Sequence, residues 1–494
     1  MQKHNLINIF IWVLVLSVFS CNTNKNKKDN NEQSKNTVQV EKGKPNIIYI
    51  LADDLGYGDL GCYGQQKIET PNIDALAKNG IKFTQHYSGS TVCAPSRSSL
   101  MTGQHTGHTP IRGNRELKGQ EGQTPLPASS ITIAEILKDQ GYATGAFGKW
   151  GLGFIGSDGD AVNQGFDEFY GYNCQRVAHR YYPTYLWRNQ DKEFLEGNDW
   201  TNTVTYAPDK IHEEALSFIE KNKDQPFFAY VPLIQPHAEL ISPKDSILQK
   251  YLGKFEETPF RDKKTSDYGP DLEVSGYCSQ ETPLAVFASM VSRIDNYVGE
   301  IVAKVKALGI EDNTIIMFTS DNGPHVEGGA EPEFFDSTGG LRGVKRDLYE
   351  GGIRAPFIVS WPGTIKAAQT SDHISAFWDV MPTVADITGA ETPTSSDGIS
   401  FLPTLLAENN QKQHDYLYWE FNNRGGRKAI RQGKWKGVWY NIHKNNGGKF
   451  ELFDLSIDKK EIHDIASEHP EMVEKLKQLI KNSHTPSELF PFDK

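Results

Sequence analysis

Cysteine is scarce in this chain: the 494 residues contain five, namely Cys21, Cys62, Cys93, Cys174 and Cys278. Small secreted folds that are held together by disulfides carry a much higher share of cysteine. The chain is therefore not a disulfide-built scaffold. With 37% hydrophobic residues, it is long and apolar enough for a large core, and its length predicts about two to three domains.

Positive charge is in deficit, because 52 Lys and Arg face 63 Asp and Glu, which gives a formal net charge of −11. General nucleic-acid binding relies on a basic surface, so we expect no nucleic-acid partner. An anionic ligand must instead be held by a local cluster of cations. No internal repeat is visible at the periods of solenoid proteins.

Long apolar runs are also lacking, and the one near the start extends only from about Leu6 to Phe19. It is too short to span a membrane, so residues 1–20 are predicted to be a signal peptide. The end of this segment, VFSC, resembles a bacterial lipoprotein cleavage box with Cys21 as the lipidated residue. Phe19 is bulkier than usual there, which leaves a plain secretory signal as the alternative. We expect an exported bacterial lipoprotein, periplasmic or at the cell surface, that meets the membrane only through its lipid anchor.

The run from Cys93 to Gly103, CAPSRSSLMTG, is the most informative segment present. Pro95 suits the first turn of a helix, where its missing N–H would be unpaired in any case. The free N–H groups and the positive dipole of a helix start attract an anion. A thiol at Cys93, a guanidinium at Arg97 and this helix start together predict an anion-handling nucleophile site. The ordinary alternative is a small buried structural cysteine.

Apolar runs that alternate with helical patterns predict an α/β fold with a mostly parallel sheet flanked by helices. The clearest helix runs from Leu284 to Leu308, where apolar residues step by three and four and Gly309 follows as a cap. The best strand patterns are Asn46–Leu51, Ala143–Phe147, Phe227–Val231, Thr314–Thr319 and Phe357–Ser360. Further helices are predicted over Asn72–Lys78, Ile131–Asp139 and Lys210–Lys221.

The chain divides into three predicted parts after the signal peptide. Residues 21–43 are too polar to bury a core and are predicted to be a disordered tether. Residues 44–405 form the predicted catalytic domain, and residues 406–494 a smaller C-terminal α+β subdomain. In the subdomain, a helix over Pro470–Ile480 follows short predicted strands at Tyr416–Phe421, Lys428–Ile430, Trp435–Tyr440 and Phe450–Asp454.

Polar side chains follow four of the predicted strands, and ligands bind beyond the carboxyl ends of strands in open α/β sheets. The pairs are Asp53-Asp54, Gly148-Lys149, Pro236-His237 and Asp321-Asn322. Three carboxylates and an amide are hard oxygen donors that suit Ca²⁺ or Mg²⁺. The alternative for each residue alone is a turn former or a solvated charge.

A glycine-rich basic segment runs from Gly339 to Gly352, and the alternative for this segment alone is a flexible basic loop. Combined with the other segments, it adds Lys345 as a predicted clamp for an anion. These segments, with ADDLGYG at residues 52–58 and the Cys93 run, resemble type I sulfatases in order and spacing. The family implies an alkaline-phosphatase-like fold and one Ca²⁺ held by Asp53, Asp54, Asp321, Asn322 and modified Cys93. It also implies that a maturation enzyme oxidises Cys93 to formylglycine, that Arg97 stabilises the hydrated aldehyde, and that Lys149, His237 and Lys345 surround the sulfate.

One position departs from the family pattern, because Trp150 is followed by Gly151 where the family commonly has a histidine. That histidine is usually assigned to deprotonating the sulfated hydrate. We expect either slower turnover or another base, with His105, His108 and His179 as unranked candidates. Each of the three has an ordinary loop histidine as its alternative.

The resemblance predicts a sulfuric ester hydrolase in which a formylglycine hydrate attacks sulfur in line and then expels sulfate. His237 is the expected general acid on the leaving oxygen, with Lys345 as the alternative. Sulfated glycans are the expected substrates, with sulfated galactose or N-acetylgalactosamine as candidates. The interleaved aromatic and basic residues of 179–188 suit either sugar stacking or packing, and Arg112 and Asn114 are further candidates for the pocket wall.

Two alternatives belong to other classes of protein. A phosphomonoesterase or phosphodiesterase of the same superfold would use a similar metal edge, usually with a Ser or Thr nucleophile. A surface glycan-binding lipoprotein with impaired catalysis is the second, and the missing histidine at Gly151 is what suggests it.

Overall fold

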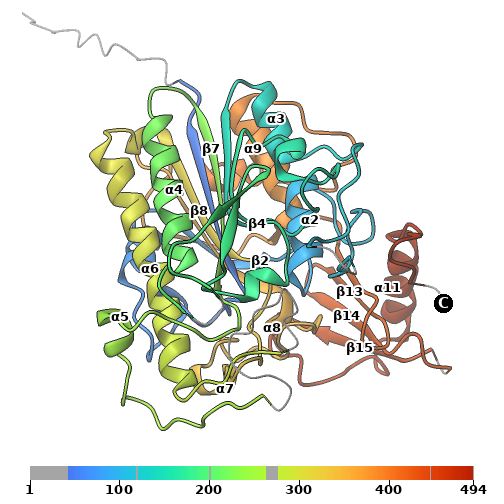
Figure 1. The fold of residues 1–494 in the computed structure, drawn as a ribbon. Helices are drawn as coiled ribbons and strands as arrows, with labels where there is room; N and C mark the ends of the chain where they lie inside the picture. The colour runs from blue at the N-terminus through green and yellow to red at the C-terminus, as the bar shows by residue number, and fades with distance from the viewer. Residues whose placement is uncertain (1–42, 118–120, 200–201, 263–275, 446, 493–494) are drawn as a thin grey trace, which may run out of the picture. The chain divides into compact units, whose positions relative to one another are not determined.

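Eleven strands form the central sheet in the part of the chain described by the computed structural model, which covers residues 43–117, 121–199, 202–262, 276–445 and 447–492 (Figure 1). The strand order is β10-β2-β9-β8-β1-β7-β3-β4-β5-β6, and β11 pairs with β2. Five neighbouring strands, from β8 to β4, run parallel, whereas β9 and β5 run antiparallel to their neighbours on either side. The strands are β1 Asn46–Asp53, β2 Ile81–Tyr87, β3 Ala143–Lys149, β4 Glu168–Tyr172, β5 Tyr185–Arg188, β6 Asp191–Phe194, β7 Phe227–Pro236, β8 Thr314–Ser320, β9 Arg354–Ser360, β10 Gln369–Ser371 and β11 Ser375–Ala376.

The central strands are apolar along their whole length because helices cover both faces of the sheet. Every residue of β1 is buried. Ile48 and Ile50 of β1 pack on one side with helices α1, α4 and α6, and Ile47 and Leu51 pack on the other with α2, α3 and α9. Figure 1 shows these two helical layers on either side of the sheet. The helices are α1 Pro71–Lys78, α2 Cys93–Thr102, α3 Ile133–Asp139, α4 Ala207–Lys221, α6 Pro283–Ala307 and α9 Val380–Thr388.

The predicted α/β architecture with a mostly parallel sheet is confirmed. Each predicted strand and helix of the catalytic part has a counterpart, and Gly309 has the left-handed φ of 70° that a cap after α6 requires. The short strands β4, β5 and β6 and the helix α9 were not predicted. Strand β2 was also missed, because Lys82, Thr84 and Gln85 interrupt its apolar pattern and make it unlike its buried neighbours.

A second, four-stranded antiparallel sheet follows, with strand order β12-β13-β14-β15 and helix α11 packed against β13. Trp419 and Phe453 of this sheet share one apolar cluster with Tyr87 and Trp378 of the larger part. The predicted C-terminal elements are all present. The first strand begins at Leu417, so the predicted start of the subdomain at residue 406 falls in the connecting segment. The elements are β12 Leu417–Phe421, β13 Arg427–Gln432, β14 Trp435–Tyr440, β15 Lys449–Asp454 and α11 Pro470–Asn482.

The predicted signal peptide, the lipid site at Cys21 and the tether up to residue 42 lie outside the described residues. Among the residues that the structure does describe, no helix has the length and apolarity needed to cross a membrane. The four described cysteines, Cys62, Cys93, Cys174 and Cys278, are free thiols. Packing therefore holds this part of the chain together without a disulfide.

Candidate active site

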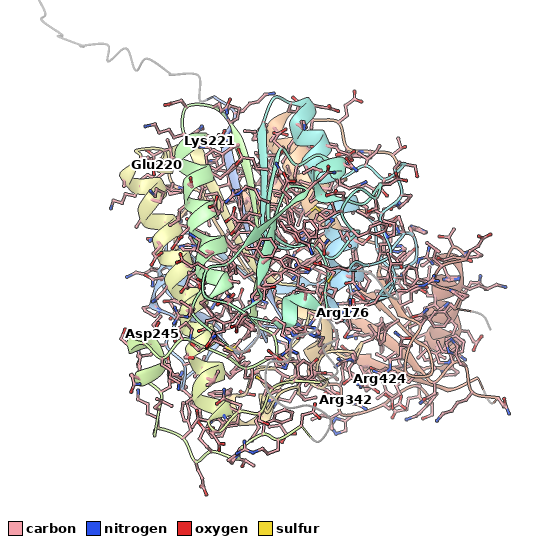
Figure 2. The ribbon with its side chains drawn as sticks, in the orientation of Figure 1. Arg176, Glu220, Lys221, Asp245, Arg342 and Arg424 are labelled. Atoms are coloured by element: carbon pink, nitrogen blue, oxygen red, sulfur yellow. The ribbon has the colours of Figure 1, made fainter. Side chains whose placement is uncertain are left out.

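The carboxyl ends of β1, β3, β7 and β8 meet at one edge of the sheet and bring the predicted polar residues together. Asp53 is the last residue of β1 and pairs in register with Pro236 of β7. Asp54 follows with a left-handed φ of 65°, which breaks the alternation of a strand and lets both carboxylates face the same side. Figure 2 shows Arg342, which precedes Lys345 in the chain, in the lower part of the molecule, and Arg176, which follows β4, near mid-height. Both lie below Lys221, which is at the upper end of α4.

Cys93 is the first residue of α2 and lies against the paired aspartates. Its Sγ is 3.2 Å from Oδ1 of Asp53 and 3.9 Å from Oδ1 of Asp54. Every residue of α2 is buried, so the helix start is held rigidly at the sheet edge. Burial, together with the charge of Asp53, raises the pKa of the Cys93 thiol well above its usual range. A thiol that stays protonated is a poor nucleophile in its unmodified form.

Three cations surround Cys93, and each pairs with a different carboxylate. Arg97 donates from Nε and from its terminal nitrogen to Oδ2 of Asp321, at 3.0 and 2.9 Å. Lys149 donates to Oδ2 of Asp53, and Lys345 donates to Oδ2 of Asp54 at 2.6 Å. Charges buried this deeply are stable only when they are paired. The pairs fix three positive charges around one small volume, which suits an anionic group.

The basic segment that carries Lys345 is tied to the site by its backbone. Lys345 N–H donates to the carbonyl oxygen of Pro324, and Arg346 N–H donates to that of Thr91. Gly352 accepts from the N–H of Gly323, next to Asn322. The alternative of a flexible basic loop therefore does not apply, and Lys345 is 4% exposed.

His237 faces the same cluster, with Nε2 2.9 Å from Nζ of Lys345 and 3.3 Å from Oδ2 of Asp54. Its Nδ1 contacts the carbonyl oxygen of Ala238. A carbonyl can only accept, so Nδ1 carries the ring proton and Nε2 accepts from Lys345. Burial and the ammonium of Lys345 lower the pKa of His237 well below its usual range. The imidazole is therefore neutral in this arrangement.

The donor set fits a divalent cation. Atoms of Asp53, Asp54 and Cys93 that could ligate lie within 4.8 Å of one another. Burial and the charge of Asp53 raise the pKa of Asp321 to about 7. For Asp53 itself, burial acts to raise the pKa, but the nearby cations Lys149 and Arg97 lower it below its usual range. Oδ1 of Asn322 is buried and has no hydrogen-bond partner among the described residues. An orphaned amide oxygen beside mutually repelling carboxylates is what a hard cation such as Ca²⁺ would satisfy.

The three histidines considered for the missing base lie in two different places. His179 stacks on His237, with ring centroids 4.6 Å apart and an interplanar angle of 14°. Burial, with Lys149 and Lys345, lowers the pKa of His179 to about 3. His105 and His108 stack on each other instead, and Nδ1 of His108 is 2.8 Å from Asp397. Of the three, only His179 contacts the predicted site residues.

The aromatic segment of residues 179–188 serves mainly as packing and support. Tyr181 is buried, and its hydroxyl donates to the carbonyl oxygens of His237 and Ile234 at 2.7 and 3.0 Å. Arg180 forms a buried ion pair with Glu239. Tyr181 thus holds the backbone that presents His237, a positioning role that the sequence pattern did not reveal.

His325 is a second residue that the sequence analysis missed. Its Nε2 is 3.0 Å from the carbonyl oxygen of Pro236, and its ring lies 5.7 Å from that of His237. Its place three residues after Asn322 was the available signal. Because a carbonyl only accepts, Nε2 of His325 carries a proton and steadies the turn before His237.

A pocket of about 280 Å³ opens beside the start of α2. Asn114 lines it and also accepts a 2.9 Å hydrogen bond from the N–H of Ala94, next to Cys93. Arg112, by contrast, is buried in an ion pair with Glu420 and does not line this pocket. The other residues that line the pocket are Gly113, Arg115, Asn422, Asn423, Leu489, Phe490 and Pro491.

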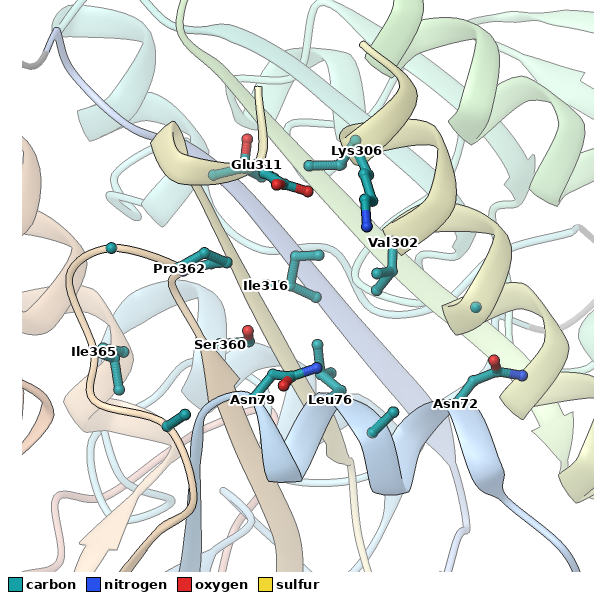
Figure 3. A pocket seen from close by; sticks show the side chains of 16 residues that line it. Asn72, Leu76, Asn79, Val302, Lys306, Glu311, Ile316, Ser360, Pro362 and Ile365 are labelled. Atoms are coloured by element: carbon teal, nitrogen blue, oxygen red, sulfur yellow. The ribbon is translucent and has the colours of Figure 1, made fainter. Parts of the chain in front are cut away.

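A different cleft, of about 430 Å³, lies near the amino end of β8, at the opposite edge of the sheet from Asp321 (Figure 3). Lys306 and Glu311 carry charge on its wall, and no cysteine or histidine lines it. The size of a cavity therefore does not mark the chemical site here. The convergence of Cys93 with paired carboxylates and cations does.

Comparison with known proteins agrees with this geometry. A family model described as sulfatase matches residues 45–390, and one described as the C-terminal part of N-sulphoglucosamine sulphohydrolase matches residues 342–485. N-acetylgalactosamine-6-O-sulfatase of Bacteroides thetaiotaomicron is 29% identical over 94% of this chain and 96% of that protein. Human arylsulfatase A is 30% identical over 88% of this chain and 87% of its own. The crystal structure of Ps i-CgsB in complex with k-i-k-neocarrahexaose has a TM-score of 0.72 at 28% identity, covering 89% and 93% of the two chains.

Proposed function

The chain belongs to the sulfatase family and is a sulfuric ester hydrolase, and from that premise we propose that it removes sulfate from sulfated glycans with formylglycine made from Cys93 and one bound Ca²⁺. One observation carries the proposal: Cys93 Sγ lies 3.2 Å from Asp53 inside a ring of three buried cations. An unmodified thiol with a raised pKa does not suit attack on sulfur. Oxidation by a maturation enzyme would supply an aldehyde whose hydrate is the nucleophile.

Asp53, Asp54, Asp321, Asn322 and residue 93 are the residues that would hold the cation. When bound, the cation would act as a Lewis acid that lowers the pKa of the attacking hydroxyl. The protein's own contribution is to hold the carboxylates together with their counter-charges before substrate arrives. Such a preorganised charge arrangement is usually the largest single contribution to transfers of this kind.

Arg97, Lys149 and Lys345 bind and orient the sulfuryl group in this proposal. Each cation is already fixed by a carboxylate, so little reorganisation is required when the group's oxygens gain charge. His237 and Lys345 together supply the proton that the leaving oxygen requires. Lys345 carries the proton in this arrangement and donates to Nε2 of His237, so the leaving oxygen receives it from Lys345, directly or through that ring.

The pocket beside Asn114 supports a saccharide as the leaving group. Its neutral amides from Asn114, Asn422 and Asn423 match sugar hydroxyls, and Arg115 matches an additional acidic group. The relatives named for N-acetylgalactosamine 6-sulfate and the neighbour bound to a carrageenan hexasaccharide make galactose-type sulfates the first candidates. Export as a lipid-anchored protein through Cys21 fits a scavenger of extracellular glycans.

Two measurements test the proposal. Mass spectrometry of the Cys93 peptide from active protein should show a loss of about 18 Da against the unmodified thiol. Sulfate release should be followed on defined oligosaccharides with sulfated galactose or N-acetylgalactosamine, beside aryl sulfate and aryl phosphate. An unmodified thiol in active enzyme, or phosphate release that exceeds sulfate release, would overturn it.

A further inference from the structure

The space in which a side chain of residue 151 would begin is taken by the flexible end of another side chain. Gly151 has a left-handed φ of 75°. A Cβ placed on it would lie 1.9 Å from Nε2 and 2.9 Å from Cδ of Gln175. Atoms cannot approach this closely, so the carboxamide of Gln175 occupies the position where a side chain at residue 151 would begin.

Gln175 is held by its backbone, while its carboxamide has no partner. Its N–H donates to Oε1 of Gln123 at 2.8 Å. The side chain is buried at 3% exposure, and neither Nε2 nor Oε1 has a hydrogen-bond partner among the described residues. A buried amide without a partner is costly and rare in folded proteins. The group is therefore expected to meet a polar ligand that enters the site.

Two neighbouring amides share this property, and with Gln175 they form what we call the carboxamide cluster. Asn173 is buried with both side-chain polar atoms unpartnered, and Nε2 of Gln123 is unpartnered as well. The carbonyl oxygen of Asn173 accepts from the N–H of Gly151 at 3.1 Å. Asn173 and Gln175 thus both contact Gly151, Gln123 holds the backbone of Gln175, and each of the three carries a buried amide with an unpartnered atom.

The cluster lies between the two halves of the site. Gly151 is two residues beyond Lys149, whose ammonium contacts Asp53. Four residues beyond Gln175, His179 stacks on the ring of His237. The segment from Asn173 to His179 therefore bridges the Lys149 side and the His237 side.

We propose that Gln175 is a substrate-binding residue whose carboxamide hydrogen-bonds an oxygen of the sulfuryl group from the space beside Gly151. This inference rests on the proposed function and deepens it. A carboxamide can donate to a sulfuryl oxygen but has no titratable proton at working pH. Gln175 therefore binds the sulfuryl group without acting as a base. It adds one neutral hydrogen-bond donor to the three charged donors Arg97, Lys149 and Lys345.

The test compares two buried glutamines. Gln175→Met should lower kcat/KM for sulfate release about 10- to 100-fold, as loss of a preorganised donor does, and weaken inhibition by inorganic sulfate. Its Tm should not fall, because no protein partner is lost. Gln164→Met is the matched control: Gln164 is buried and donates to the carbonyl oxygen of Asp158, so this variant should lose Tm and keep the activity of the folded enzyme.

Gln175→Glu adds a readout that packing alone would not produce. Its carboxylate should repel the sulfuryl group, raise KM more than the Met variant does, and lose part of that effect when the pH is lowered. Gly151→His alone should be inactive and destabilised, whereas Gly151→His with Gln175→Ser should recover folding and gain an acidic limb in its pH profile, where activity falls as the new histidine is protonated. The proposal is overturned if Gln175→Met and Gln175→Glu both stay within about twofold of the parent in kcat/KM and sulfate inhibition.

A failure of the proposed function can be told apart from a failure of this inference. If the parent releases no sulfate from any glycan, calorimetric titration of inorganic sulfate onto the parent and Gln175→Met still measures the hydrogen bond. Weaker binding to the variant supports the role of Gln175, and equal binding overturns it.

Discussion

Two buried groups of charges occupy this protein, and they differ in how completely they are paired. The active-site cluster comprises Asp53, Asp54, Arg97, Lys149, Asp321 and Lys345. The joining cluster comprises Tyr87, Glu350, Arg354, Lys436 and Glu461, and it connects the large sheet with the C-terminal sheet. Both clusters are almost wholly buried, so buried charge alone does not distinguish a reactive site from a structural one.

In the joining cluster nearly all of the charges close on one another, and Oε1 of Glu461, which accepts no hydrogen bond, lies 3.2 Å from the ammonium of Lys436. Both oxygens of Glu350 are used: Oε1 accepts from Lys436 at 2.7 Å, and Oε2 accepts from Tyr87 and Nε of Arg354 at 2.7 Å each. Glu461 accepts from the N–H of Glu350 at 2.6 Å. At the active site, by contrast, a thiol and the amide oxygen of Asn322 stand beside the charges without equivalent partners. Incomplete pairing beside a nucleophile, and not charge itself, marks the reactive site.

The largest expected effect breaks the active-site cluster at its nucleophile. Cys93→Ala should lower kcat by at least about 10⁴-fold, as loss of a nucleophile does elsewhere, while Tm changes little. Sulfate release and thermal unfolding measure the two quantities. Cys62→Ala, at a half-buried thiol outside the site, is the control and should keep full activity; residual turnover by Cys93→Ala near the parent rate would contradict the assignment.

The joining cluster should respond in the opposite way. Lys436→Met leaves Glu350 and Glu461 buried with fewer counter-charges, and loss of one partner of a buried pair costs about 3–5 kcal/mol. Urea unfolding should show this loss, while kcat of the folded enzyme stays within a few-fold. Lys434→Met removes a half-exposed lysine that pairs with Asp454 and should cost less than about 1 kcal/mol. Equal losses in the two variants would contradict the structural role.

Removal of the proposed cation should separate the clusters without any mutation. Chelation and dialysis should lower activity at least about 100-fold, and Ca²⁺ should restore it, because in the proposed mechanism the cation lowers the pKa of the attacking hydroxyl. Lys436→Met enzyme should show the same ratio of activities with and without Ca²⁺. Activity that survives full chelation would exclude the metal from the reaction.

The pH dependence of stability should report the joining cluster. Burial and the charge of Glu350 raise the pKa of Glu461 from 4.5 to about 7. A raised pKa in the folded state means that this group's stabilisation is complete below about pH 4.5 and is lost as the pH rises towards 7. Glu461→Gln stays neutral, so it should gain stability relative to the parent between about pH 5 and pH 8 in urea unfolding. A change of the opposite sign would contradict the assignment.

The smallest effect concerns the edge of the active site. Asn114→Ala removes the acceptor for the N–H of Ala94 at the start of α2. A cap of this kind is worth about 1 kcal/mol, so kcat/KM on a saccharide should fall about 5- to 10-fold. Asn423→Ala lines the same pocket without this hydrogen bond and should raise KM alone. Identical kinetic changes in both variants would show that the cap has no separate role.

Much of the site was predictable because strand ends in a parallel sheet share an edge. Asp53, Lys149, His237 and Asp321 each follow an apolar run, and that local signal places them together. Helices α1, α3, α4 and α6 were predictable for a similar reason, because the spacing of their apolar residues is a local property of the sequence. Strand β2 and the positioning role of Tyr181 were not, since neither leaves a periodic signal in the sequence.

The sequence by itself determined which chemical groups stand at the sheet edge, because periodicity and motif spacing are local properties of the chain. Only the tertiary structure decided which other residues contact those groups. The carboxamide of Gln175 fills the space at Gly151, His179 lies on His237 while His105 and His108 lie elsewhere, and Glu350 meets Lys436 across 86 residues. Such contacts join residues far apart in sequence, and packing of the whole fold decides which of them form.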